Sequence, residues 1–228
     1  MTPTTLNRTR RVVGTALAAA TLAAALSACA PLIVGGAVVG GVMAVDRRTA
    51  GTQIEDEGIE LRAANRIRET LGDRAHVNVT SYNRQALLTG EVATAQDRQA
   101  VEQMVSQVEN VRSVVNDLAV MPPSTLSQRS TDTFITGKVR ASLVDAQDIS
   151  ANSFKVVTER NIVYLMGRVS QREAGRATAI ARGITGVSKV VRVFEYLTEE
   201  EAASLNAGKQ AKPANAVNGE VPETRPAQ

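Results

Sequence analysis

The alternation of apolar and polar residues follows one pattern twice along the chain. Residues 77–92 (VNVTSYNRQALLTGEV) and 154–169 (FKVVTERNIVYLMGRV) each contain two apolar stretches separated by a polar pair, and they align without a gap at an offset of 77 residues. Such stretches on either side of a polar turn are typical of a β-hairpin. We therefore expect two small domains of one design. Gly90 and Gly167 are expected at equivalent strand positions where another backbone approaches closely.

Helical periodicity surrounds each hairpin. In the first half, residues 61–71 have helical spacing that ends at Gly72-Asp73, and residues 95–108 and 111–120 predict a second helix and a last strand. In the second half the corresponding segments are residues 135–143, 177–184 and 187–194. The order is α-β-β-α-β in both halves. This order predicts an α+β fold of two tandem domains, each with two helices packed on a three-stranded mixed sheet.

Changes in composition set the expected boundaries. Met121-Pro122-Pro123 marks a linker, because two prolines disfavour both a helix and a central strand. The last residues are polar and rich in Ala, Asn, Gly and Pro, which indicates a disordered tail. We expect a signal peptide (1–28), a lipidated glycine-rich linker (29–51), a first domain (52–121), a linker (122–131), a second domain (132–198) and the tail (199–228).

The N-terminus has the features of a secretory signal. Arg8, Arg10 and Arg11 precede an apolar stretch, residues 12–26, that is short for a membrane span, and small residues follow. The sequence Leu-Ser-Ala before Cys29, the one cysteine of the chain, resembles the lipobox of bacterial lipoproteins. That resemblance implies cleavage before Cys29 and acylation of its sulfur and amino group. A buried or redox-active cysteine is the alternative. Ala30, rather than Asp, implies sorting to the outer membrane, where the protein would face the periplasm.

Residues 31–45 are apolar and rich in glycine. About 15 residues are fewer than the roughly 20 that a membrane-spanning helix needs. We interpret the segment as lying next to the membrane; a continuation of a transmembrane anchor is the alternative.

Charge and composition argue against several function classes. Removal of residues 1–28 would take away three arginines and no acidic residue, so the formal charge of +3 would fall to 0, and no nucleic-acid partner is expected. His76 has no second histidine and no nearby cysteine, so we expect a surface or edge residue and no metal site. The acidic run Glu55-Asp56-Glu57 indicates a helix start rather than an acid/base pair. No catalytic constellation is expected, and no cofactor.

The repeated unit resembles the BON domain family. The resemblance rests on the hairpin endings at Gly90 and Gly167 and on the pattern that Gly186 begins, G-V-x-x-V-x-x-V. Asn110 departs from it, since it stands where the second unit has Gly186. The segment 132–140 (DTFITGKVR) is the most specific match, and the whole arrangement resembles outer-membrane lipoproteins with two such domains. The resemblance implies a non-catalytic periplasmic module that binds anionic phospholipid and supports outer-membrane integrity.

One aromatic residue lies away from the expected core. Helical spacing places Phe134 on the outer side of the helix that Ile135, Val139 and Leu143 bury. With Leu71 aligned to Leu143, Arg62 is expected at the position of Phe134. An exposed ring beside a lysine suits a lipid interface; packing of the ring against the first domain or the linker is the alternative. The expected lipid-binding residues are Thr133, Phe134, Gly137, Lys138 and Ala141.

Two hypotheses follow for the function. The first is a lipoprotein whose second domain binds an anionic phospholipid surface. The second is an adaptor that recruits an envelope-assembly or division machine through the same surfaces, with lipid contact only through the acyl anchor. The sequence specifies neither the lipid, nor the protein partner, nor the oligomeric state.

Overall fold

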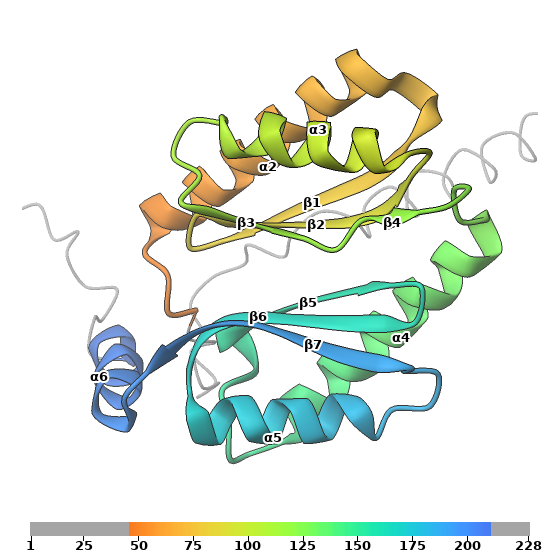
Figure 1. The fold of residues 1–228 in the computed structure, drawn as a ribbon. Helices are drawn as coiled ribbons and strands as arrows, with labels where there is room; N and C mark the ends of the chain where they lie inside the picture. Colours follow the sequence, from red (N-terminus) through yellow and green to blue (C-terminus); the bar gives the residue numbers. More distant parts are fainter. Residues whose placement is uncertain (1–45, 211–228) are drawn as a thin grey trace, which may run out of the picture. The chain divides into compact units, whose positions relative to one another are not determined.

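The computed structural model of the protein describes residues 46–210, which form two α-β-β-α-β repeats (Figure 1). The helices α2 and α3 cover one face of the first sheet, and α4 and α5 cover one face of the second. The first repeat consists of α2 (Ala50–Leu71), the short 3-10 turn η1 (Gly72–Arg74), β1 (His76–Tyr82), β2 (Gln85–Val92), α3 (Ala95–Ser106), β3 (Ser113–Asn116) and β4 (Ala119–Val120). The second consists of α4 (Leu126–Asp145), the 3-10 turn η2 (Ala151–Ser153), β5 (Phe154–Glu159), β6 (Ile162–Ser170), α5 (Gln171–Arg182) and β7 (Lys189–Leu197).

Both sheets have the mixed topology that the sequence predicts. The hairpin strands pair antiparallel, β1 with β2 and β5 with β6, and the last strand pairs parallel with the second hairpin strand. In the first repeat that last strand is divided into β3 and β4, which both pair with β2. Between them, the side-chain amide oxygen of Asn116 accepts a hydrogen bond from the backbone N–H of Leu118.

The two hairpin turns are held by an aspartate from the preceding helix. The turn residues have positive φ, 51° and 67° at Asn83 and Arg84, as a two-residue hairpin turn requires. The carboxylate of Asp56 accepts hydrogen bonds from both of their backbone N–H groups, at 2.8 and 2.7 Å. Asp132 does the same for the second turn, at 2.9 and 2.8 Å. Asp56 therefore lies buried in α2 as a clamp on the turn, and the interpretation of the acidic run as a helix start is wrong.

These equivalent aspartate contacts show which residues of α2 and α4 occupy the same positions in the two repeats. Asp56 and Asp132 are 76 residues apart, so the buried residues Ile59, Ala63 and Ile67 match Ile135, Val139 and Leu143. The alignment of Leu71 with Leu143 is wrong by one helical turn. Gly58, and not Arg62, occupies the position of Phe134. Leu61, where the predicted helical spacing begins, is exposed, because the buried side of α2 runs through Ile59 and Ala63.

The hairpin glycines occupy equivalent places. A Cβ atom on Gly90 would lie 2.0 Å from the carbonyl oxygen of His76, and one on Gly167 would lie 2.4 Å from that of Ser153. The chain therefore has no room for a side chain at either position. At the start of the last strand, Asn110 adopts a φ of 67° where Gly186 has 101°, so asparagine serves the same left-handed position.

The sheet faces without helices contact each other. Tyr82 and Leu87 of the first repeat share a buried cluster with Tyr164, Met166 and Val193 of the second. Polar contacts cross the same interface: the Tyr164 hydroxyl donates to the Asp117 carboxylate at 2.6 Å. The helix-covered faces form two further, separate cores.

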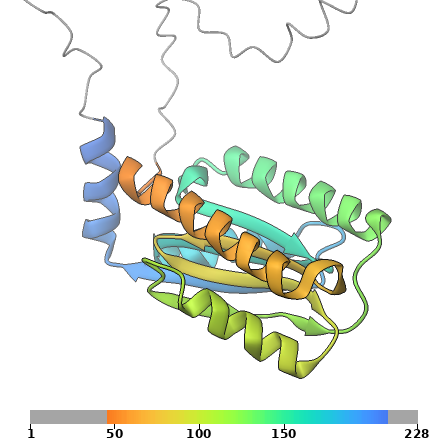
Figure 2. The same ribbon diagram turned by 90° about the horizontal axis from the view of Figure 1, so that it is seen from above.

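Three segments expected to be linker or tail are structured, each for a local physical reason. The helix α4 begins at Leu126, inside the expected linker 122–131, because Thr125 and Gln128 form a reciprocal capping box. Residues 46–49, expected in a linker, pack against the folded part: Arg47 donates two hydrogen bonds to the carboxylate of Glu173, at 2.7 and 2.8 Å. Residues 199–210, expected in a disordered tail, form helix α6 (Glu199–Gln210), which Figure 2 shows beside the segment that precedes α2. There the Arg47 side chain also donates to Asn206.

Candidate functional site

The outer face of α4 carries three exposed large apolar side chains. Leu126, Phe134 and Val144 are 79%, 67% and 69% exposed. With a rise of about 1.5 Å per residue they are distributed over about 27 Å of the helix. Helical spacing places all three on the side opposite the buried residues Ile135 and Val139. Of the three, the sequence predicted Phe134 alone; Leu126 lay in the expected linker, and Val144 was not singled out.

The five residues predicted to bind lipid lie on this helix, around Phe134. The Lys138 ammonium lies 5.0 Å from the centroid of the Phe134 ring and donates to the carbonyl oxygen of Thr185 at 2.5 Å. Thr133 and Ala141 are exposed, and nothing lies within 4 Å of a Cβ built on Gly137. The ring therefore projects from a surface of small residues, and its exposure contradicts the alternative that it packs against the first domain or the linker.

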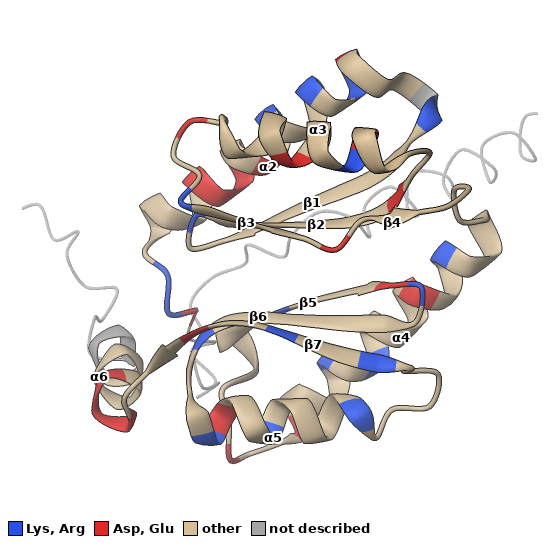
Figure 3. Cartoon of the chain, viewed as in Figure 1, with Lys and Arg blue, Asp and Glu red and all other residues tan. Residues whose placement is uncertain are grey.

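The matching face of α2 differs in its chemistry. At the positions of Leu126, Phe134 and Val144 it carries Ala50, Gly58 and Arg68. Arg62, the counterpart of Lys138, pairs with Glu55 at 2.5 Å. Two large apolar residues, Ile54 and Leu61, are exposed on α2, but they lie among charges of both signs. Eight of the 22 residues of α2 are charged against five of the 20 of α4, and Figure 3 shows both signs along α2.

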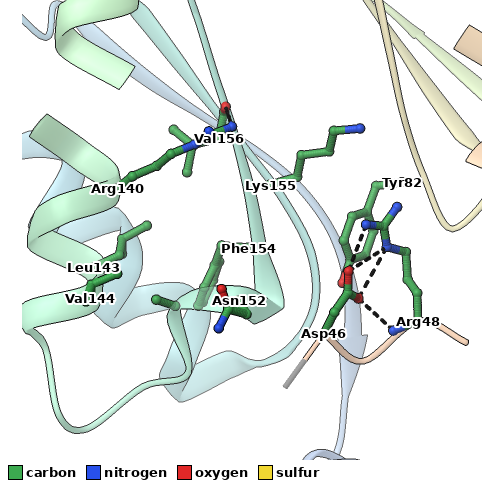
Figure 4. Close-up of a pocket in the computed structure, with 11 residues that line it drawn as sticks. Asp46, Arg48, Tyr82, Arg140, Leu143, Val144, Asn152, Phe154, Lys155 and Val156 are labelled. Carbon is green, nitrogen blue, oxygen red and sulfur yellow. Dashed lines mark hydrogen bonds and ion pairs between the residues drawn. The ribbon is translucent and has the colours of Figure 1, made fainter. Parts of the chain in front are cut away.

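A cavity of about 420 Å³ lies beside α4, between Arg140 and the start of β5, and Val144 of the outer face also lines it (Figure 4). It combines an apolar wall, which includes Phe154, with the cations Arg48, Arg140 and Lys155. The Lys155 ammonium donates to Glu60 at 2.6 Å, and Arg48 pairs with Asp46 at 2.8 Å and with Asp56 at 2.7 Å. An anionic ligand would have to compete with these carboxylates. No local sequence signal marks this cavity, because segments far apart in the chain form its walls.

A second polar cluster joins the two repeats. Nδ1 of His76 lies 3.0 Å from Oε2 of Glu91 and 4.0 Å from Oε1 of Glu159. Burial raises the pKa of Glu91, but hydrogen bonds from Ser124, His76 and Arg160 outweigh it, so that pKa lies below its ordinary value. For Glu159, burial dominates and raises the pKa. His76 opens β1, an edge strand of its sheet, so the expectation of an edge residue is confirmed, although only 18% of its side chain is exposed. Sequence spacing could not reveal the cluster, because Glu159 belongs to the other repeat.

The predicted lipidation residue Cys29, and Ala30 after it, lie outside the residues that the structure describes. The same holds for the signal peptide and for the apolar segment 31–45. Between residues 46 and 210, no helix combines the length and the hydrophobicity that crossing a bilayer would require.

The architecture defines a class: tandem α-β-β-α-β proteins in which helices cover one face of each mixed sheet and the other faces meet. The protein belongs to the BON domain family, whose model matches residues 56–122 and 131–198. The two matches correspond to the two repeats, and the resemblance seen in the hairpin and strand patterns is confirmed.

Two curated relatives align with most of the chain, and a third aligns with a shorter part. The protein is 36% identical over 174 residues to the outer membrane lipoprotein DolP of Haemophilus influenzae, an alignment that covers 75% of this chain and 90% of the relative. It is 32% identical over 155 residues to the 21 kDa hemolysin of Actinobacillus pleuropneumoniae, which covers 67% of this chain and 80% of that protein. A shorter match, 42% identical over 60 residues, covers 26% of this chain and 30% of the osmotically-inducible protein Y of Escherichia coli. None of these names describes an enzyme activity.

Proposed function

We propose that the protein is a lipid-anchored, non-catalytic protein of the outer membrane, that it faces the periplasm, and that it binds an anionic phospholipid surface through the outer face of α4. The observation that carries the proposal is the exposed Phe134 ring with the Lys138 ammonium 5.0 Å from its centroid. A ring can enter the boundary between headgroups and acyl chains while the ammonium pairs with a phosphate. This contact would support the integrity of the outer membrane by holding the folded repeats against it.

The contributions of the two side chains differ in size. Burial of a phenylalanine side chain stabilises a bound state by roughly 1.5–3 kcal/mol. One basic residue near an anionic surface contributes about 1 kcal/mol. The ring therefore dominates. The contact is weak and reversible by itself, and an anchor at Cys29 would make it effective by keeping the second repeat close to the bilayer.

Vesicle binding by a soluble form, residues 46–228, tests the proposal without the anchor. The soluble form should sediment with vesicles of phosphatidylcholine and phosphatidylglycerol and not with phosphatidylcholine alone. Phe134→Ala should weaken this binding roughly tenfold to a hundredfold, since each 1.4 kcal/mol corresponds to a factor of ten. Leu61→Ala is the matched control, because Leu61 is 64% exposed on the corresponding helix of the first repeat.

The outcomes distinguish the proposal from the adaptor hypothesis. Circular dichroism and the melting temperature should be unchanged in both variants, because neither side chain is buried. Equal loss of binding in the two variants would contradict a site on α4. The adaptor hypothesis would be favoured if the protein binds no vesicles but captures an envelope protein, and if Phe134→Ala abolishes that capture.

The anchor is tested separately, in cells. Cys29→Ala should abolish labelling by a fatty-acid analogue. The variant should remain a precursor that is not cleaved to the mature form. Ala30→Asp should move the protein toward the inner membrane. Labelling that persists in Cys29→Ala would rule out the lipoprotein assignment while leaving the vesicle experiment intact.

A further inference from the structure

Three side chains from three strands converge where the two repeats meet. His76 begins β1, Glu91 lies in β2 and Glu159 ends β5. Their ligand atoms, the imidazole Nδ1 and one carboxylate oxygen from each glutamate, all lie within 4.8 Å of one another. Glu91 is fully buried and the Glu159 side chain is 3% exposed, so two carboxylates are withdrawn from water close together.

Neighbouring groups orient both carboxylates toward the imidazole. Arg160 donates to Oε1 of Glu91 at 3.3 Å, and the backbone N–H of Ser124 donates to Oε2 at 3.1 Å. Asn78 donates to Oε2 of Glu159 at 2.7 Å. The other oxygen of Glu159, Oε1, accepts no hydrogen bond from residues 46–210 and faces His76. At Glu159 a donor holds one oxygen and leaves the other for an ion, as is typical of the surroundings of metal ligands, whereas both oxygens of Glu91 already accept hydrogen bonds.

The charges in this region leave a place for one more cation. Glu91 and Glu159 are accompanied by Asp132, whose oxygens already accept from the two turn N–H groups of the second hairpin. Arg160 pairs with Glu91, and Arg129 of α4 lines the same cavity and donates to the Ser124 hydroxyl. With a neutral imidazole the three carboxylates still outnumber these two cations. Two buried carboxylates without sufficient positive charge are costly to keep ionised.

We propose that His76, Glu91 and Glu159 bind a divalent transition-metal ion of the zinc class, which ties the first repeat to the second. An imidazole nitrogen together with two carboxylate oxygens suits zinc or cobalt, whereas calcium and magnesium take oxygen ligands. Bonds of about 2.0–2.2 Å to a tetrahedral ion place two ligand atoms about 3.4 Å apart. The distance of 3.0 Å between Nδ1 and Glu91 is close to this value, whereas the 4.0 Å to Glu159 and the widest separation, up to 4.8 Å, require side-chain shifts of about 0.6 and 1.4 Å.

The cluster opens onto a cavity from which an ion could enter. A cavity of about 390 Å³ is lined by His76 and Glu159, together with polar side chains of α4 that include Arg129, Thr133 and Thr136. Water in this cavity could supply a fourth ligand. The inference goes beyond the proposed function, because nothing in it depends on Phe134 or on a lipid.

Metal binding can be measured on the full chain, purified without an affinity tag in non-ionic detergent and dialysed against EDTA. Titration with Zn²⁺ should saturate at one ion per chain and raise the melting temperature. Titration with Co²⁺ should give visible absorption bands of a nitrogen- and oxygen-ligated ion. Zinc affinity should fall as the pH is lowered, because protons compete with the ion for the ligand atoms.

Variants locate the site. His76→Ala and Glu159→Gln should each weaken zinc binding by more than about a hundredfold, since even the loss of an outer partner costs about ten- to a hundredfold. Glu195→Gln is the control, because Glu195 is also a carboxylate between the repeats, accepting from Asn83 at 2.6 Å, and it should leave zinc affinity unchanged. If Glu159→Gln fails to fold, His76→Ala provides the test, because the His76 side chain is partly exposed.

Absence of stoichiometric zinc and cobalt binding would overturn the proposal. Binding that His76→Ala does not weaken would overturn it equally.

Discussion

In the first repeat Asp56 accepts hydrogen bonds from the backbone of the hairpin turn, and in the second repeat Asp132 makes the same two bonds. The core residues of α2 and α4 follow at the same spacing. On the outer faces, by contrast, Gly58 and Arg68 stand where the second repeat has Phe134 and Val144. The interior has kept one design because the turn and the core require it, whereas the outer faces are unconstrained by packing and have diverged.

The sheet faces that meet show a second kind of difference. Asp117 in the first repeat corresponds to Val193 in the second, at an offset of 76 residues. The Asp117 carboxylate accepts from the Tyr164 hydroxyl, whereas Val193 joins the apolar cluster. Burial raises the pKa of that hydroxyl, and Asp117 raises it further, so Tyr164 stays a neutral donor. The two faces have therefore become complementary rather than identical.

The largest expected difference concerns the starts of α3 and α5. Asp97 and Glu173 occupy equivalent capping positions, but Glu173 alone is buried and paired with Arg47. Glu173→Ala would leave the buried Arg47 guanidinium without its carboxylate and should lower the free energy of unfolding by about 3–5 kcal/mol. Asp97→Ala, the matched control, should cost about 1 kcal/mol or less. Urea unfolding followed by circular dichroism measures both, and similar costs would contradict the importance of the Arg47 contact.

The same pair predicts an acid dependence of stability. Burial raises the pKa of Glu173, but the hydrogen bonds from Arg47 and from the Ser170 backbone outweigh it, so that pKa lies below its ordinary value of 4.5. The ionised carboxylate therefore stabilises the fold above pH 4.5, and this contribution is lost as the pH falls through the lower pKa of the folded protein. In Glu173→Gln the free energy of unfolding should fall less steeply below about pH 4.5 than in the wild type. Parallel curves would show that Glu173 does not titrate as described.

A smaller effect concerns the lysine beside Phe134. Lys138→Ala should weaken binding of residues 46–228 to anionic vesicles about fivefold, corresponding to about 1 kcal/mol, and should reduce its salt dependence. The effect is modest because the ammonium already donates to the Thr185 carbonyl. Arg62→Ala, the matched change on α2, should alter neither quantity. Vesicle binding measured over a range of salt concentrations tests both expectations. A larger effect of Arg62→Ala than of Lys138→Ala would place the membrane contact on α2 and contradict the proposal.

The repeated pattern was enough to predict the order of elements, the mixed sheets and both hairpin turns. These features depend on local alternation and on turn residues such as Asn83 and Arg84, which the sequence displays directly. The alignment of the first helices failed by one turn, because apolar spacing repeats every turn and cannot fix the phase. Asp56 and Asp132 fix it, and their role becomes visible only when the turn N–H groups are in place.

Contacts between distant segments escaped prediction for a related reason. Arg47 seemed part of a polar linker, but its partner Glu173 lies 126 residues away. The cluster of His76 with Glu159 depends in the same way on how the two sheets meet. Phe134 could be found, because a single helical period suffices to show that a ring points away from the core.

The claim that the second repeat, and not the first, contacts the membrane can be tested with one fluorescent residue, since the chain contains no tryptophan. Phe134→Trp and Leu61→Trp place a single indole on the exposed face of α4 or of α2. With vesicles of anionic phospholipids brominated in the acyl chains, the Phe134→Trp emission should shift to the blue and be quenched, while that of Leu61→Trp should stay unchanged. Quenching of Leu61→Trp alone, or no quenching of Phe134→Trp while the protein sediments with the vesicles, would contradict the account.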